Sequence, residues 1–297
     1  MSSNSNIAKP KLACEIAADR VLAGRFADHG GGLEACAARE LAPGSVVPDL
    51  VENNLRQREA VRAGIEAALG AVAGRSKDVI AIVPDAAVRV MLVEFDTLPS
   101  DHEEALGVVR FRLKKSLPFD VDKAKVSYHA QKLADEVKVV AAVALASVVE
   151  EYESLFRDAG FNPGVVLPSM LAALGGADAK RPTLVVKVDA HTTSLAILNE
   201  DQLQLFRTLE NARGVTITGE QLAEEVYPSV VFFQDTYHLN IERIYVAGLS
   251  DAAAAAGALR AQTGAEVQEL VASSQLGAAS GAVPRWRMAG VVGALVS

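Results

Sequence analysis

A basic cluster followed by an apolar turn is the part of this sequence whose residue types most suggest binding. The bases lie near the end of an expected helix and the turn follows directly: Arg110, Arg112, Lys114 and Lys115, then Leu117, Pro118 and Phe119. Cations near a helix C-terminus are favoured by about 0.3–1 kcal/mol each, which accounts for the bases but not for the apolar turn. A partner peptide beside this surface would bury Phe119 while its acidic side chains met the basic rim. The pattern favours a partner surface, and direct membrane attraction is a weaker expectation because the net charge is −8.

Other residues that could do chemistry lack the spacing that the chemistry requires. The segment GAVAGRSK at 70–77 lacks the GxxxxGK[ST] order of a phosphate-binding loop and follows a helix rather than a strand. The glycines at 30–32 join two expected strands and are typical of a hairpin turn. The five histidines and two cysteines show no ligand spacing, and His191 fits a solvated turn. The residues by themselves therefore indicate no catalytic centre and no metal site.

The first part of the chain predicts a meander, a helix and a buried strand. Alternating apolar and polar residues predict strands at 11–17, 20–27 and 33–41. An amphipathic helix is expected over about 53–73, and DVIAIVPD reads as a short strand covered on both faces.

The middle of the chain changes character. VRVMLVEF predicts a strand, and the capping-box pattern from Ser100 to Glu103 predicts the start of a helix. That helix would carry Leu106, Val109, Leu113 and Leu117 on one stripe. Two strands, AKVSYHAQKL and VKVVAAVALA, and a second helix ending at Gly160 follow. The order β-α-β-β-α predicts a compact α+β unit inside a longer chain.

From Arg181 onward the opening pattern returns. Three strands, a helix capped by Thr218 and Gln221, a strand RIYVAG, an alanine-rich helix, a strand AEVQELV and a short helix around 286–296 are expected. Two halves of similar order indicate an internal duplication. The sequence thus predicts a first half at 1–84, an insert at 85–165, and a second half at 166–297.

The bulk composition narrows the function classes. Half of the 297 residues are apolar, and 37 acidic against 29 basic residues argue against a dedicated nucleic-acid binder. Cys14 and Cys36 are expected to be reduced thiols. The polar N-terminus predicts no export signal, and the apolar run near the end is about ten residues where a bilayer needs ~20. A cytoplasmic protein is the expectation.

The duplicated meander resembles the actin-like ATPase fold, an α/β fold built from two ribonuclease-H-like halves, and the insert narrows the resemblance. The segments at 80–99, 105–120 and 126–131 look like PilM, the cytoplasmic actin-like protein of type IV pilus assembly. Similar arrangements occur in the cell-division protein FtsA and in the type II secretion protein GspL. The resemblance runs from about Lys11 to Val296 and suggests a shortened, degenerate member.

This resemblance implies a location and partners. PilM-type proteins sit at the inner face of the cytoplasmic membrane. They bind the N-terminal cytoplasmic peptide of a membrane protein, PilN, in a groove beside the inserted subdomain, and link the pilus platform to its motor ATPases. On this basis the partner-binding residues are expected to be Arg110, Lys114, Leu117, Pro118 and Phe119.

The resemblance also implies two glycine turns that hold nucleotide phosphates, and both are altered. The first corresponds to Glu15-Ile16-Ala17 with Asp19, and the second to Lys187-Val188-Asp189 with Thr192 and Thr193. The family's adenosine-side Gly-Gly motif is reduced to Gly248. Alanine and aspartate replace the glycines and lysine replaces one acid, so a negative charge is expected to face the phosphates. If the second turn slides by two residues, Asp189 supplies the acid, and glycine is still missing.

A roof over the nucleotide is also expected to be absent. Only ENARGVTITG separates Leu209 from Glu220, which is too short for the fourth subdomain of the active relatives. The sequence therefore predicts a pseudo-ATPase scaffold without a cofactor. The alternatives are an ATP- and Mg²⁺-dependent assembly protein of the actin and FtsA kind and, ranked last, a small-molecule kinase.

Overall fold

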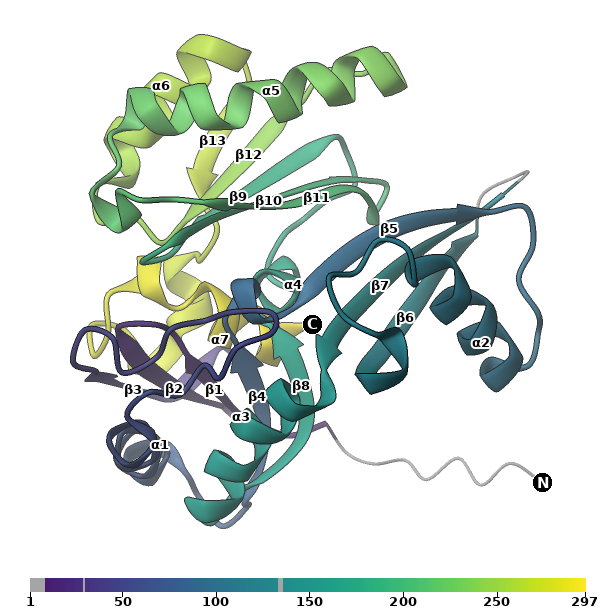
Figure 1. Cartoon of the computed structure of the whole chain (residues 1–297). Helices are drawn as coiled ribbons and strands as arrows, with labels where there is room; N and C mark the ends of the chain where they lie inside the picture. The colour runs from purple at the N-terminus through teal and green to yellow at the C-terminus, as the bar shows by residue number, and fades with distance from the viewer. Residues whose placement is uncertain (1–8, 29, 133–135) are drawn as a thin grey trace.

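Two five-stranded sheets with the same strand order form the framework of the molecule (Figure 1). The structure is a computed structural model and describes residues 9–28, 30–132 and 136–297. The first sheet has the order β3-β2-β1-β4-β8. Its strands are β1 (Leu12–Ile16), β2 (Arg20–Phe26), β3 (Leu33–Glu40), β4 (Asp78–Val83) and β8 (Asn162–Pro168). The first three strands are antiparallel, and β1, β4 and β8 run parallel.

The second sheet repeats this arrangement in the order β11-β10-β9-β12-β13. Its strands are β9 (Thr183–Val188), β10 (Thr192–Asn199), β11 (Gln202–Glu210), β12 (Arg243–Ala247) and β13 (Glu266–Glu269). Again the first three are antiparallel and the last two run parallel to the central strand. The expected internal duplication and the α/β fold class are confirmed.

Long helices cover the outer face of each sheet (Figure 1). Helices α1 (Arg58–Val72) and α3 (Ala146–Asp158) pack on the first sheet, and α5 (Gly219–Tyr237) and α6 (Ala252–Thr263) pack on the second. Helix α1 buries Val61, Ile65, Ala68, Leu69 and Val72, the spacing of an amphipathic helix. The expected capping box of α5 is present: the Thr218 side chain accepts from Gln221 N, and Thr218 N donates to Gln221 Oε1.

Two short helices pack against each other between the sheets. They are α4 (Ser169–Leu174), after β8, and α7 (Ala289–Val296), near the end of the chain. A Cβ added at Gly293 would lie 2.3 Å from Ala172 O, and one at Gly175 would lie 2.4 Å from Gly293 O. Glycine is therefore required where the two backbones touch. A shared core joins both helices to both sheets.

The inserted unit has its own sheet and core. Strands β5 (Arg89–Phe95), β7 (Val137–Leu145) and β6 (Ala124–Lys132) form a sheet in that order, covered by α2 (His102–Leu113). Short 3₁₀ helices η1 (Asp85–Ala87), η2 (Val121–Lys123), η3 (Gly214–Thr216), η4 (Ser273–Ala279) and η5 (Arg285–Arg287) occupy the connections.

Two details of α2 correct the sequence interpretation. Its N-cap is Asp101 rather than Ser100, and the Asp101 carboxylate accepts from the N–H of Glu103 and Glu104 at 3.0 Å each. The helix ends at Leu113, so Leu117 lies in the following loop and not on the apolar stripe.

The insert also contacts the second half. The Gln131 amide bonds to both the N–H and the C=O of Leu203, at 2.7 and 3.0 Å. Within the expected range 85–165, α3 and the start of β8 pack on the first sheet, whereas β5, α2, β6 and β7 form the separate unit. The boundaries at 84 and 165 stay a prediction.

The structure bears on three further expectations from the sequence: the start of α1, the state of the two cysteines, and membrane-spanning helices. Helix α1 begins at Arg58 instead of about 53, because the buried Asn54 amide bonds locally to Asp49 O and Glu52 O. Cys14 and Cys36 are free thiols, as expected. Among the described residues, no helix is both long and apolar enough to cross a lipid bilayer.

Candidate functional site

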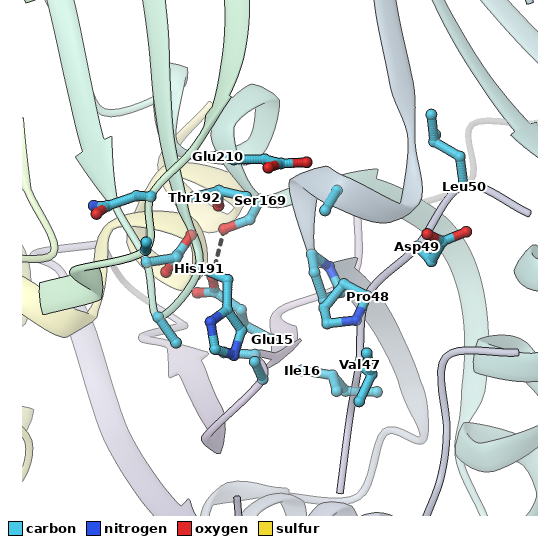
Figure 2. Close-up of a pocket in the computed structure, with 18 of the residues that line it drawn as sticks. Glu15, Ile16, Val47, Pro48, Asp49, Leu50, Ser169, His191, Thr192 and Glu210 are labelled. Carbon is cyan, nitrogen blue, oxygen red and sulfur yellow. Dashed lines mark hydrogen bonds between the residues drawn. The ribbon is translucent and has the colours of Figure 1, made fainter. Parts of the chain in front are cut away.

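A cavity of about 790 Å³ lies where the two halves and the insert meet. Its walls come from the turn after β1, the turn after β9, the segment 47–51, the end of β11, and Pro118 of the insert. Figure 2 shows Glu15 and His191 on one side, Val47, Pro48, Asp49 and Leu50 on the opposite side, and Glu210 above them. In an actin-like fold this is the position between the two phosphate turns.

The two turns behind this cavity have the same hydrogen-bond pattern. Ala17 N donates to Arg20 O, and Asp189 N donates to Thr192 O, each at 2.8 Å. Because Glu15 and Lys187 both lie two residues before the donor that closes the turn, they occupy equivalent positions in the two halves. This match supports the register without the two-residue shift.

Opposite charges at these equivalent positions form a buried bridge between the halves. Lys187 Nζ lies 3.6 Å from Glu15 Oε1 and binds Asp189 Oδ2 directly. Both Glu15 and Lys187 are 3% exposed. The negative charge that the sequence analysis expected at the second turn is that of Asp189, which lines the cavity, and Lys187 partly compensates it.

A second buried cation adds to this partial compensation. Arg20 begins β2 directly after the turn and is 3% exposed. Its guanidinium lies 2.8 Å from the Asp19 carboxylate oxygens and 3.8 Å from Asp189 Oδ1. The sequence analysis did not single out Arg20, although a base in a short turn between apolar strands was a usable signal.

The environment shifts the pKa values of this cluster in a consistent way. Burial raises the pKa of Glu15, since the nearby Lys187 only partly offsets the loss of hydration. Burial opposes ionisation of Asp189 as well, but Lys187 and Arg20 outweigh it and lower the pKa. Burial alone would lower the pKa of Lys187, yet Asp189, Glu15 and Asp85 together raise it. Lys187 therefore stays charged.

Asp85 is a further buried acid that sequence reasoning missed. It follows β4 and is 2% exposed. Its carboxylate accepts from Met170 N at 2.8 Å and from Ser194 Oγ at 2.7 Å, which ties the first half to the second. Burial raises the pKa of Asp85 to about 6. An acid at the carboxyl end of a parallel strand is a general site signal and could have identified it.

Glu15 is held from two more directions. Ser169 Oγ, at the start of α4, donates to Glu15 Oε1. Glu15 Oε2 has no hydrogen-bond partner among the described residues. It faces Gly290 of α7, where an added Cβ would lie 2.6 Å from this oxygen. The carboxylate is thus fixed in position by both helices of the interface.

The residues expected to bind nucleotide do not fit ATP and Mg²⁺. The N–H groups of Ala17 and Asp189 close their own turns, and the cation of Lys187 is engaged by acids. Thr192 lines the cavity, but Thr193 is buried and its Oγ1 accepts from Asn211 Nδ2 at 3.0 Å. A triphosphate here would meet carboxylates instead of free amides.

Gly248 serves packing instead of adenosine. It has φ +85°, and an added Cβ would lie 1.8 Å from Val188 O. It does not line the cavity. The fourth subdomain is absent as expected, because only a loop with the 3₁₀ helix η3 connects β11 to α5. No group of acidic, histidine or cysteine side chains in the described ranges is arranged to hold a metal ion.

The expected partner-binding residues are divided between different environments. Arg110 is half-buried and donates to Val121 O and Ala124 O at 2.9 and 3.2 Å, so it holds its own loop. Leu117 and Phe119 pack against the core of the insert. Pro118 lines the cavity, and Lys114 is exposed at the end of α2.

The exposed aromatic of the basic helix is Phe111, at 81% exposure, which sequence reasoning passed over. The apolar turn expected after this helix is partly exposed: Pro118 is exposed, and the Phe119 ring is half-buried against the core of the insert.

Comparisons with known proteins agree on the fold. No family model matches the chain, and no curated protein sequence matches it significantly. A solved PilM–PilN type IV pilus biogenesis complex matches with a TM-score of 0.77 and 20% identity, covering 96% of this chain and 98% of that one. The ethanolamine utilization protein EutJ of Carboxydothermus hydrogenoformans matches with a TM-score of 0.56 and 8% identity, covering 96% and 89%.

A third match is the cytoplasmic domain of EpsL, an inner-membrane component of the type II secretion system of Vibrio cholerae. It has a TM-score of 0.51 and 11% identity, covering 79% of this chain and 80% of that one. The actin-like fold is therefore established, and the resemblance to PilM in fold extends over nearly the whole chain.

Proposed function

We propose that this protein is a non-enzymatic scaffold of a type IV pilus platform, or of a related type II secretion platform. It would act at the inner face of the cytoplasmic membrane and contact further platform and motor proteins there. The likeness in fold to the PilM chain and to the EpsL cytoplasmic domain supports this assignment.

The observation that carries the non-enzymatic part is the buried bridge from Glu15 through Lys187 to Asp189. It lies behind the cavity and holds the Lys187 cation between carboxylates of both turns. Phosphate transfer needs free donors and a bound cation at the developing charge, and the cations here are committed to protein carboxylates.

The partner in this proposal is the N-terminal cytoplasmic peptide of a PilN-like membrane protein. The cavity supports it, because both Pro118 of the insert and the segment 47–51 of the first half line it. Val47 and Val51 are 42% and 47% exposed, which is apolar surface that a peptide would cover.

Calorimetric titration with such a peptide tests the proposal. Wild-type protein should bind the peptide. Val51→Asn should weaken binding by about tenfold, since it removes an apolar contact that the bound peptide would bury. Val165→Asn is the matched control, because Val165 is 42% exposed on β8 and lies outside the cavity. Absence of wild-type binding, or equal weakening by both variants, contradicts a peptide site here.

A separate measurement addresses the ATP-dependent alternative. Millimolar MgATP should leave the melting temperature unchanged, because a ligand stabilises only in proportion to its affinity for the folded state. A saturable rise with MgATP, absent in Ala17→Arg, would show that the cavity takes nucleotide.

A further inference from the structure

The charges around the cavity all have the same sign. Four carboxylates line it, those of Glu15, Asp49, Asp189 and Glu210. None of the described lining residues is a lysine or an arginine. The cations of Lys187 and Arg20 contact its carboxylates and are almost fully buried.

The four carboxylates differ in how far cations compensate them. Lys187 and Arg20 partly compensate Glu15 and Asp189 from behind. The Asp49 carboxylate accepts from the N–H groups of Val51 and Glu52. These bonds, together with the nearby Arg56 cation, lower its pKa, so it is ionised at neutral pH. Glu210 is exposed, and no other side chain or backbone group in the described part of the chain bonds to its carboxylate. Figure 2 shows Glu210 at the top of the opening and Asp49 at its right.

The rest of the lining is apolar. Ile16, Val47, Leu50, Val51 and Pro118 contribute to it. An anionic ligand would be repelled by the carboxylates, and a wholly apolar ligand would strip water from Asp49 and Glu210 without replacing it. An apolar stem that ends in a cation satisfies both surfaces.

We propose that the occupant of this cavity is a peptide segment of apolar residues that carries one lysine or arginine, whose cation lies between Asp49 and Glu210. This inference rests on the proposed function and specifies the chemistry of its partner peptide. The sequence analysis expected acidic side chains of the partner peptide to meet Lys114 and its neighbours. The present proposal instead requires a basic side chain on the peptide. The volume of about 790 Å³ lies within the range of roughly 300–1,000 Å³ that holds small ligands, and suits a few residues.

Two capped peptides that differ in one side chain test the proposal. The probes are acetylated and amidated Ala-Leu-Arg-Leu-Ala and Ala-Leu-Glu-Leu-Ala, titrated by NMR at low ionic strength. Wild-type protein should bind the arginine peptide at least about tenfold more tightly than the glutamate peptide. The charge-removing variant Glu210→Gln should reduce this ratio to below about threefold, and Glu210→Lys should abolish it.

A matched variant separates a local effect from the effect of the overall charge. Glu224 is exposed on α5 and does not line the cavity. Glu224→Gln removes the same charge from the molecule and should leave the ratio at its wild-type value.

The outcomes distinguish this inference from the proposed function. Equal binding of the two probes, or a ratio that survives Glu210→Gln, overturns the inference. If the PilN-like peptide nevertheless binds, and binds equally after its basic residues are replaced, the scaffold function stands without this charge rule. If the arginine probe shows the expected preference but the PilN-like peptide does not bind, the chemistry of the cavity stands and the assigned partner falls.

Discussion

The two halves of the molecule share one strand order and differ in the charge they place at equivalent positions. Glu15 on β1 and Lys187 on β9 precede turns closed by the same hydrogen bond. In a duplicated fold with two phosphate turns, both positions would face a common ligand. Here they face each other at 3.6 Å. The two halves thus share a backbone arrangement, and the side chains at these equivalent positions form a contact between the halves.

The buried bridge and the cavity in front of it also differ in exposure and in charge. The bridge is nearly closed to solvent and its charges cancel in part, whereas the cavity opens to solvent and has the carboxylates of Asp49 and Glu210 in its lining. We expect the bridge to contribute to stability, and we propose that the cavity contributes to recognition. Variants of the bridge should change the free energy of unfolding, whereas variants of the cavity lining should change peptide binding.

The largest effect is expected when the bridge loses its cation. Lys187→Ala leaves Glu15 and Asp189 buried with one fewer positive charge and should lower the free energy of unfolding by roughly 3–5 kcal/mol. The control is Lys180→Ala, which removes an exposed pair with Asp201 and should cost less than about 1 kcal/mol. Urea denaturation of both variants measures the difference. Similar losses would mean that the bridge is no more than a surface pair.

The next effect tests whether the halves depend on the contact of α4 with α7. Gly293→Ala adds a Cβ that would lie 2.3 Å from Ala172 O. The resulting strain should lower the free energy of unfolding by roughly 1–3 kcal/mol. Gly257→Ala in α6 meets no atom within 4 Å and should stabilise the protein by about 0.5–1 kcal/mol. Thermal unfolding of the two variants should therefore shift in opposite directions.

A pH titration of stability sharpens the comparison at Asp85. Because the pKa of Asp85 is raised in the folded state to about 6, protonation favours folding. Its contribution is fully present below the unfolded pKa of about 4 and is lost as pH rises through 6. Asp85→Asn keeps the shape without the titration, so its stability relative to wild type should improve by roughly 2 kcal/mol from about pH 4.5 to pH 7.5.

The controls for this titration are the neighbouring acids. The pKa of Glu15 is also raised, so some slope of the same sign should remain in Asp85→Asn. The pKa of Asp189 is lowered, so its contribution is lost only at more acidic pH, as pH falls through its folded value. A variant curve parallel to wild type would show that Asp85 does not titrate in this range.

The smallest effect on stability is expected for Phe111, which lies on the insert. Phe111→Ala removes a ring that is 81% exposed and should change the free energy of unfolding by less than about 0.5 kcal/mol. Phe119→Ala removes a ring packed on the insert core and should cost more, roughly 1–3 kcal/mol. Hydrogen exchange of the insert distinguishes them, since only Phe119→Ala should increase exchange in β6 and β7.

The repeated framework was predictable from sequence because strand alternation and helix caps are local signals. The meander strands, α1 and the capping box of α5 follow directly from such patterns. Strand β8 and helix α4 were missed. The strand contains two prolines and a glycine, and its half-exposed pattern gives no clean alternation. Pairing with β4, which lies far away in the sequence, decides its conformation.

The site was predictable only in part, for a related reason. The sequence identified the two altered turns, and the structure brings Glu15, Ala17, Asp189 and Thr192 to one cavity. The contact between Lys187 and Glu15 could not be predicted from local patterns, because it joins residues from different halves. The same limit applies to Phe111 and Phe119. Which of the two rings packs on the insert core depends on where helix α2 ends, and it ends at Leu113.

The position of α7 has a consequence for how the chain folds during synthesis. Every residue from Ala289 to Leu295 is buried, and the helix packs on β1, β2 and β4, which leave the ribosome long before it. The part of the first sheet that α7 covers therefore stays open until residues 289–295 have been translated. A ribosome stalled before residue 289 would present a chaperone with a nearly complete sheet that lacks its inner cover.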